Sequence, residues 1–418
     1  MKVKSVYLVQ VHEEKYFGEF LDQSKQQLSH SSTRVVLLYN VKAEAASSNT
    51  TVADIAPIHS ERVPGQSLPG TPSTDSPLRP TSTTRRNDIY AEWDTMETVH
   101  AVRDALAEQY HVDLVEANED AYERLRDLRP DFAFNMSEGL YGVSREAQIP
   151  AILEMLRIPY LGSDPLTLSV CLDKSRAKEI LLYYGVPTPS FSVIPSVQAL
   201  CDAVVKYPAM VKPLHEGSSK GIYNSCVVNS ARELEREVRT ILETYEEPAL
   251  VEDFLVGREF TVAMMGNGDD VRVLPIVELK FDALPVGVNH IYSYEAKWIW
   301  DRSDNPLDIF ECPARLDDKL EAAIERVCRD AYRILRCRDW SRIDVRLDSH
   351  HQPNIIEVNP LPGILPKPED NSCFPKAARA VGLDYRRMIQ TVAEIAMRRT
   401  GVRNSHIGKA ATEQVAVI

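Results

Sequence analysis

Apolar residues in the first part of the chain follow strand and helix periods in turn. Residues 35–39 form a largely apolar run, which is typical of a buried strand. One helix face is indicated by the spacing of Met96, Val99, Val102, Ala105 and Leu106. The pattern is completed by three strands at residues 3–11, 112–115 and 132–135 and by a helix at residues 122–128. This alternation predicts a parallel α/β domain that ends near residue 168.

The remainder of the chain is rich in predicted strands. A helix at residues 174–184 ends at Gly185, where a left-handed residue can close it. The next elements are five strands, at residues 191–194, 209–212, 222–228, 249–254 and 259–265. A helix is expected at residues 230–245. Further elements are a strand, a helix, two paired strands and a last helix, at residues 273–279, 317–335, 342–348, 354–359 and 384–398. We expect these elements to form further domains, separate from the first.

The two paired strands carry polar residues at every second position. If they pair symmetrically about residues 350 and 351, Asp344 lies opposite Glu357 and Arg342 lies opposite Asn359. All four side chains then leave one face of the hairpin. The other face would hold the apolar residues between them, which are Ile343, Val345, Ile356 and Val358.

A sheet face with two acids, an amide and an arginine is costly to bury unless a ligand neutralises it. Mg²⁺ with substrate phosphates is the simplest neutraliser, because Mg²⁺ takes one or two carboxylates and completes its octahedron with phosphate and water. A surface hairpin held by ion pairs is the alternative. The apolar opposite face favours the metal interpretation.

Length and composition limit the classes of protein. A chain of 418 residues is expected to hold two or three domains. Its net charge of −13 argues against nucleic acid as the main partner, and no run of 18 apolar residues predicts a membrane span. Seven cysteines without a Cys-x-x-Cys pair indicate neither structural zinc nor a disulfide framework. We therefore expect a cytoplasmic enzyme that acts on small molecules.

Four regions are expected along the chain. Residues 1–168 form the parallel α/β domain, interrupted at 43–87 by a segment of Ser, Thr, Pro and Gly that cannot build a core. A small strand-rich module follows at 169–255, and a larger module with the acidic hairpin at 256–400. Residues 401–418 are expected to be a polar tail.

Two further segments carry candidate chemistry. Residues 212–222 run Lys-Pro-Leu-His-Glu-Gly-Ser-Ser-Lys-Gly-Ile, a turn whose glycines and serines can offer N–H and O–H donors to phosphate. Residues 251–255, Val-Glu-Asp-Phe-Leu, end a strand with an acid that can accept a hydrogen bond from an adenine amino group. Each segment alone is also compatible with an ordinary hairpin loop or a charged strand end.

The order of these three segments resembles the ATP-grasp superfamily, and most closely the D-alanine–D-alanine ligase family. The resemblance runs from about residue 132 to 383. It rests on Glu-Gly-Leu-Tyr-Gly at 138–142, Leu-Asp-Lys at 172–174, Glu-Gly-Ser-Ser at 216–219, Gly-Arg-Glu-Phe-Thr at 257–261, Glu-Ala-Lys at 295–297, Arg-Ile-Asp at 342–344 and Glu-Val-Asn at 357–359. It implies a three-domain α/β protein, with α+β character in the ATP-binding part, that holds ATP between two sheets.

The resemblance also implies a role for each matched residue. The nucleotide would be bound by Lys174, Lys212, Glu216, Gly217, Ser219, Gly221, Glu252, Asp253, Phe254, Leu255 and Glu259. Two Mg²⁺ ions, with Mn²⁺ as an alternative, would be held by Asp344, Glu357 and Asn359. Catalysis would use Arg342, Gly363, Ser218 and Lys297, and substrate would contact Ser372 and Trp298.

The chain departs from the family where amino-acid substrates bind. The family's Gly-Gly-x-Ser-x-Glu after the first strand is missing, and only Glu13 or Glu14 could replace its acid. Trp298 stands where the family has tyrosine. A longer, proline-containing rim at residues 364–371 precedes Ser372.

These departures favour an ATP- and Mg²⁺-dependent ligase of specialised metabolism. Such an enzyme would join a carboxylate to an amine through an acyl phosphate, with amino-acid-like substrates, and would be a homodimer as in the family. One alternative is true D-alanine–D-alanine ligation for peptidoglycan. The other is an ATP-dependent phosphotransferase or an ATP-binding protein that does not ligate.

Overall fold

The computed structural model describes residues 33–42, 88, 90–301 and 307–402. The predicted strand at 3–11, the insertion at 43–87, the acids Glu13 and Glu14, and most of the predicted tail therefore lie outside the described residues.

The first sheet is parallel, as the sequence predicted. Its strand order is β2 (His111–Glu116), β1 (Arg34–Tyr39), β3 (Phe132–Asn135), and both pairings are parallel. The strands are joined through α2 (Met96–Ala107) and α3 (Ala121–Leu128), and α4 (Gln148–Leu156) follows β3. The central four residues of β1 are fully buried, because both faces of the sheet are covered.

The largest sheet carries the acidic hairpin. Its strand order is β11 (Phe310–Glu311), β10 (Val277–Leu279), β8 (Glu259–Met265), β12 (Trp340–Leu347), β13 (Pro353–Asn359), and β9 (Arg272–Val273) pairs with β8. One face packs on α8 (Asp318–Ile334), α5 (Pro165–Leu172) and α6 (Lys174–Tyr183) in a single apolar cluster. Beyond the hairpin lie α9 (Cys373–Ala380) and α10 (Tyr385–Thr400).

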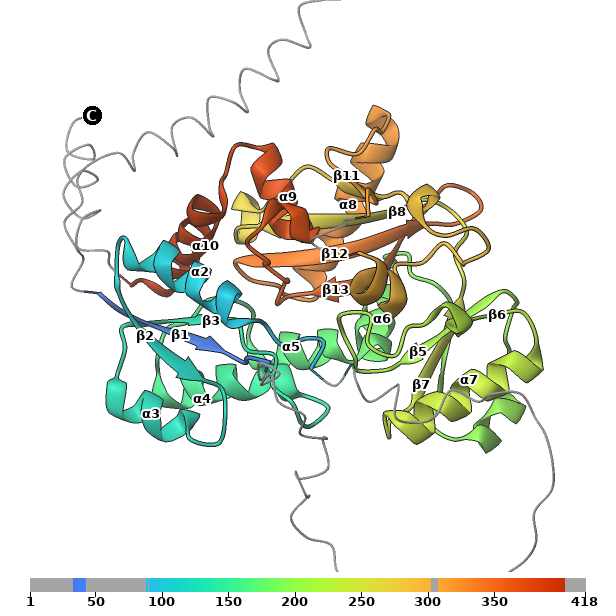
Figure 1. Cartoon of the computed structure of the whole chain (residues 1–418), viewed down its shortest axis with the longest axis horizontal. Helices are drawn as coiled ribbons and strands as arrows, with labels where there is room; N and C mark the ends of the chain where they lie inside the picture. The colour runs from blue at the N-terminus through green and yellow to red at the C-terminus, as the bar shows by residue number, and fades with distance from the viewer. Residues whose placement is uncertain (1–32, 43–87, 89, 302–306, 403–418) are drawn as a thin grey trace, which may run out of the picture.

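The smallest sheet is antiparallel and has its own core. Its order is β4 (Phe191–Ile194), β7 (Ala249–Asp253), β5 (Ala209–Pro213), β6 (Val227–Val228). Apolar side chains of α7 (Ala231–Thr244) pack on it. Figure 1 shows this sheet below the largest one, with α6 between them.

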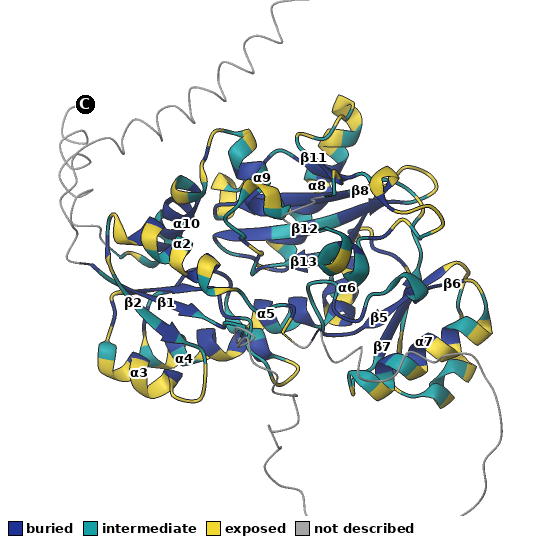
Figure 2. Cartoon of the chain, in the orientation of Figure 1, coloured by how far each residue is buried: buried dark blue, intermediate teal, exposed yellow. Residues whose placement is uncertain are grey.

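The first and the largest sheets share one hydrophobic core. Trp340 at the start of β12 is fully buried and makes edge-to-face contacts with Phe134 of β3 and Phe374 of α9, at centroid distances of 5.8 and 5.5 Å. The buried faces in Figure 2 accordingly continue from β1 and β3 toward β12. The domain boundaries drawn from the sequence stay a prediction.

Two predicted strands are wrong in extent. Only Val227–Val228 of the segment 222–228 pairs with β5, because the backbone of Ile222 instead accepts a bond from Tyr294 N–H at 2.7 Å. The segment 273–279 divides into β9 and β10. Pro275 lies between them and has no N–H to offer the sheet.

The register of the hairpin agrees with the prediction where it matters most. Asp344 pairs with Glu357 and Arg342 with Asn359. A bulge after Asp344 then shifts the pairing, so that Val345 lies opposite Ile355. Ile356, which we placed on the apolar face, is the extra residue and lines the cavity described below, so that assignment is wrong.

None of the helices in the described part of the chain is long and apolar enough to cross a bilayer.

Candidate active site

A cavity of about 750 Å³ lies between the smallest and the largest sheets. Its volume is in the usual range for a small-molecule site. Most residues singled out from the sequence line it, namely Lys212, Ser218, Ser219, Glu252, Asp253, Phe254, Leu255, Glu259, Lys297, Trp298, Arg342, Asp344, Glu357, Gly363 and Ser372. An adjoining pocket is lined by Lys174, Gly217 and Asn359, together with Arg342 and Gly363.

Two of the predicted residues, Glu216 and Gly221, line neither pocket. The carboxylate of Glu216 pairs with Lys220 at 2.8 Å and with Arg145 at 3.1 Å. Gly221 has φ +74°, and a Cβ there would lie 2.4 Å from Pro213 Cγ, so glycine is needed for close packing. Both residues shape the loop at residues 216–221, and neither of them lines the cavity.

The acidic hairpin is neutralised by basic side chains. Arg342 Nη2 lies 3.0 Å from Asp344 Oδ2, and Lys174 Nζ lies 3.0 Å from Glu357 Oε1. Burial opposes ionisation of Glu357, but Lys174 and Lys212 nevertheless lower its pKa. Glu357 is therefore held charged.

The donor set at the hairpin fits Mg²⁺. Asp344, Glu357 and Asn359 can supply two carboxylates and an amide oxygen, which leaves positions for phosphate and water. Asn359 Nδ2 now donates to Asp344 Oδ2 at 3.3 Å, and a half-turn of the amide would present its oxygen instead. Thr261 Oγ1, on the neighbouring strand, and Arg342 Nε are buried without a hydrogen-bond partner among the described residues. Such orphaned polar atoms at a cavity wall indicate that a polar ligand completes the site.

Glu252 at the end of β7 is held by two lysines. Its carboxylate lies 2.6 Å from Lys212 Nζ and 3.0 Å from Lys178 Nζ, and all three residues are buried. Burial would raise the pKa of Glu252, but the two ammonium groups lower it to about 2. Burial lowers the pKa of Lys178 to about 8, although the charge of Glu252 acts to raise it. The structure thus joins Lys212 and Glu252, which the sequence analysis assigned to opposite ends of the nucleotide.

The predicted phosphate loop, residues 216–221, and the loop bearing Lys297 meet at the cavity. Ser218 and Ser219 have φ of +50° and +60°, a strained left-handed conformation for residues with a Cβ. Trp298 Nε1 donates to Ser218 O at 3.1 Å, and Ser219 Oγ donates to Tyr292 O at 2.9 Å. These two bonds, one donated by each loop, hold the first loop in place.

Lys297 lies on a π-helical turn, Ala296–Trp300, and lines both pockets. Burial, followed by the charge of Arg342, lowers its pKa to about 8. Two cations contact the aromatic ring of Trp298, with Lys42 Nζ 4.4 Å and Lys297 Nζ 5.2 Å from its centroid. Three positive groups, those of Lys42, Lys297 and Arg342, therefore line this end of the cavity.

The rim after Gly363 is closed by Ser372. The hydroxyl of Ser372 donates to Gly363 O at 3.1 Å and accepts from Leu365 N–H at 3.2 Å. A Cβ built on Gly363 would meet nothing within 4 Å, so its backbone borders open space in the cavity.

Several residues of the site were missed by the sequence analysis. Lys178 follows Lys174 by one helical turn, and Arg346 follows Asp344 at strand spacing, so both could have been found by periodicity. Arg346 bonds Glu259 at 2.7 Å and lies over the ring of Phe254.

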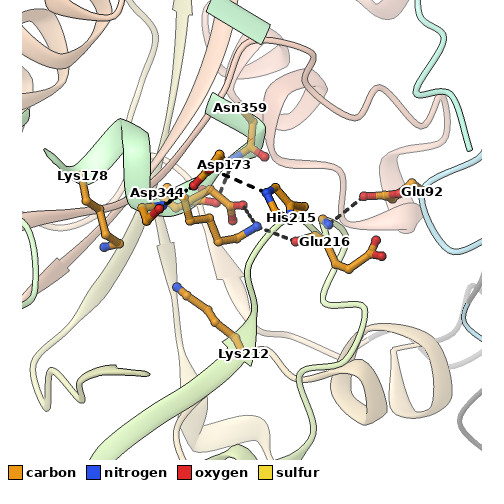
Figure 3. A network of polar contacts seen from close by, with 12 residues as sticks. Glu92, Asp173, Lys178, Lys212, His215, Glu216, Asp344 and Asn359 are labelled. Carbon is orange, nitrogen blue, oxygen red and sulfur yellow. Dashed lines mark hydrogen bonds and ion pairs between the residues drawn. The ribbon is translucent and has the colours of Figure 1, made fainter. Parts of the chain in front are cut away.

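Glu92 and Arg145 form a second missed group. Their side chains pair at 2.8 Å, and Glu92 also accepts from Gly217 N–H at 2.7 Å in the phosphate loop. They come from distant parts of the chain and no local pattern marks them. Figure 3 shows Glu92 and Glu216 on one side of the polar network, with Lys212 and Asp344 on the other.

Comparisons with known proteins identify relatives by sequence and by fold. The family model described as the D-ala D-ala ligase C-terminus matches residues 184–394. The D-alanine–D-alanine ligase of Pelotomaculum thermopropionicum is 32% identical over 323 residues, which cover 74% of this chain and 94% of that protein. An uncharacterised protein of Sinorhizobium fredii is 34% identical over 266 residues, which cover 64% of this chain and 74% of that protein.

A solved structure shares the fold. The VanG D-Ala:D-Ser ligase of Enterococcus faecalis aligns with a TM-score of 0.60 at 18% identity, over 87% of this chain and 99% of that one.

Proposed function

The chain belongs to the D-alanine–D-alanine ligase-like family of ATP-grasp enzymes, and from that premise we propose that it joins an amino-acid-like carboxylate to an amine, with a substrate pair other than two D-alanines. It is an ADP-forming carbon–nitrogen ligase that uses ATP and Mg²⁺. Its own substrate pair, and its place in specialised metabolism, are our proposal.

The observation that carries the proposal is the convergence of two kinds of group in one cavity. Asp344 and Glu357 are suited to a metal–phosphate group, while Arg342 and the Gly363 backbone border the same space. A phosphotransferase has no tetrahedral carbon to stabilise, so a cationic and N–H pair beside the metal site favours acyl transfer.

At the nucleotide end, Glu252 is kept anionic by Lys178 and Lys212, and its remaining lone pairs can accept from an adenine amino group. Backbone groups of Asp253 to Leu255 can serve the ring edge, and Glu259 the ribose. Lys174 and the loop with Gly217 and Ser219 line the two pockets and would contact the phosphates.

At the reacting end, Asp344, Glu357 and Asn359 would hold Mg²⁺, and we propose two ions. Bound Mg²⁺ would neutralise charge on the transferred phosphate. Lys297 reaches the same space from its loop. Arg342 and Gly363 N–H would stabilise the oxyanion, and Ser218 would orient the attacking amine. We further propose a homodimer.

The departures of this chain support a different substrate pair. Trp298 is larger than the family's tyrosine and donates to the phosphate loop. The hydroxyl of Ser372 already bridges both ends of the rim at residues 364–371, so a substrate carboxylate would compete with those bonds. A site whose buried polar groups do not match a ligand discriminates strongly against it.

Ligation of two D-alanines remains the second candidate, because a relative of that name matches 74% of this chain. The test is product mass and ADP release, with ATP and Mg²⁺, for D-alanine alone and for a panel of paired amino acids. We expect little dipeptide from D-alanine and a stoichiometric amide from another pair. Robust D-alanyl-D-alanine formation would establish the second candidate, and ADP without any conjugate would favour phosphotransfer.

A further inference from the structure

His215 forms a buried charged cluster behind the phosphate loop. Its side chain is 8% exposed and lines neither pocket described above. Nδ1 lies 2.8 Å from Glu247 Oε2, and Nε2 lies 3.6 Å from Asp173 Oδ2. Both ring nitrogens therefore face carboxylates, one on either side. In Figure 3 the ring of His215 lies between Asp173 and the loop that carries Glu216.

Each partner of His215 belongs to a different segment of the nucleotide site. Asp173 caps α6 by accepting from the N–H groups of Ser175 and Arg176, and Lys174 is the first residue of that helix. Glu247 precedes β7, which ends with Glu252 and Asp253.

The third segment is the phosphate loop itself. His215 stands between Lys212 and this loop. Lys174 Nζ donates to the carbonyl of Glu216, the next residue, at 2.6 Å. The cluster thus ties together the three segments that carry Lys174, Lys212 and Glu252.

Only the imidazolium form of His215 has an N–H for each carboxylate, a hydrogen bond to Glu247 and a longer ion-pair contact with Asp173, since neutral histidine has one N–H. Burial would lower the pKa of His215, but Asp173 and Glu247 raise it to about 9. Because this lies above the ordinary value of 6.5, the bridge is fully present below pH 6.5 and is lost as pH rises through 9.

Other charges near His215 lie on its backbone side. Arg145 Nη2 donates to the carbonyl of His215 at 2.9 Å and pairs with Glu92 and Glu216. Lys174 faces Glu216 O and Glu357. Among the described residues, only Asp173 and Glu247 form ion pairs with the ring.

We propose that His215 is a positioning residue for nucleotide binding, whose two ring nitrogens clamp the start of the phosphate loop between the N-terminus of α6 and the segment before β7. This inference rests on the proposed ATP site. It assigns His215 no contact with substrate. Its effect reaches the nucleotide through Lys174 and the loop at residues 216–221.

The test measures the affinity of the Mg²⁺ complex of AMP-PNP by calorimetry from pH 6.5 to 9.5. We compare His215→Gln, which keeps one neutral donor, His215→Arg, which keeps a permanent cation, and the exposed control His100→Gln. At pH 7 we expect His215→Gln to bind roughly tenfold more weakly, since one charge-assisted bond is lost. His100→Gln should match the unmodified protein.

The decisive readout is the ratio of the unmodified protein's affinity to that of His215→Gln. Burial lowers the pKa of Lys178 and of Lys297 to about 8, and because both lysines are present in both proteins their effect should cancel in the ratio. We expect the ratio to approach one as pH rises through 9. The unmodified protein should lose affinity as His215 loses its proton near pH 9, whereas His215→Arg, which stays charged, should not show this loss. The comparison of these two proteins is the test if His215→Gln does not fold.

A ratio that stays constant with pH would show a packing role alone and overturn the inference. Equal affinities at pH 7 would also overturn it. If the unmodified protein fails to bind the AMP-PNP complex at any pH, the proposed function itself falls, and this inference falls with it.

Discussion

At the scale of single residues, the site depends on acids that are buried and paired. Glu252 has two ammonium partners, whereas each of those lysines has Glu252 as its one carboxylate partner within 4 Å among the described residues. The arrangement is asymmetric, so the loss of the acid and the loss of one base have different consequences.

Glu252→Gln should destabilise the protein more than Lys178→Met. The glutamine leaves Lys178 and Lys212 facing each other without a counterion, which costs about 3–5 kcal/mol of unfolding free energy for a buried pair. In Lys178→Met, Glu252 still has Lys212, so about 1–2 kcal/mol is expected. Urea unfolding at pH 7 measures both, and a larger loss in Lys178→Met would contradict the asymmetry.

Glu357→Gln should abolish ATP turnover while the fold persists. The glutamine keeps the shape of the side chain but removes a charge from the proposed metal ligands. ADP release is measured, and circular dichroism checks the fold. Near-normal turnover in a folded variant would refute the metal assignment.

At the scale of elements, the active site is made where loops from different sheets meet. The loop at residues 216–221 follows β5 of the smallest sheet, and the turn Ala296–Trp300 belongs to the chain between β10 and β11 of the largest. They are joined by the bond from Trp298 to Ser218 O, and both residues line the cavity. The strained backbone of Ser218 and Ser219 persists because that second loop supports it.

Trp298→Phe should loosen the phosphate loop. Phenylalanine keeps a ring beside Lys42 and Lys297 but lacks the N–H that bonds Ser218 O. The loss of about 0.5–1.5 kcal/mol should raise KM for ATP roughly two- to tenfold and speed amide exchange at residues 216–221.

The matched control is Trp300→Phe, two positions along the same turn, which should leave that exchange unchanged. Exchange rates in Trp298→Phe that equal those of the control would mean that the Trp298 bond does not hold the loop.

At the scale of the whole molecule, Asp339 joins three parts of the chain. It is fully buried and accepts from Gly162 N–H at 2.8 Å, Asn267 Nδ2 at 2.8 Å and Arg399 Nη2 at 2.7 Å. These donors lie after β3, after β8 and in α10, so a single carboxylate helps to hold the first sheet against the largest. The oligomeric state stays a prediction.

Asp339→Asn should lower the unfolding free energy by about 3 kcal/mol. Asparagine keeps the side-chain shape and tolerates the φ of +65° there, but it leaves Arg399 without a counter-charge. The control Asp330→Asn removes a half-exposed pair with Arg333 and should cost at most about 1 kcal/mol. Equal costs in thermal or urea unfolding would contradict the buried role of Asp339.

The sequence alone predicted most of the elements and which acidic residues of the hairpin lie opposite each other. Helices and strands with strong periods, such as α2 and α7, were predicted because their apolar faces must be buried. The pairing of Asp344 with Glu357 followed from the strand period of two.

Only the tertiary structure decided which distant groups meet. Glu92 and Arg145 reach the phosphate loop, His215 bridges Asp173 and Glu247, and no period along the chain relates these positions. The bulge that turns Ile356 into the cavity could not be predicted from the sequence either, because an alternating pattern implies a regular ladder of paired residues. Local periodicity reflects which face is buried, whereas ion-pair partners depend on how separate elements pack in space.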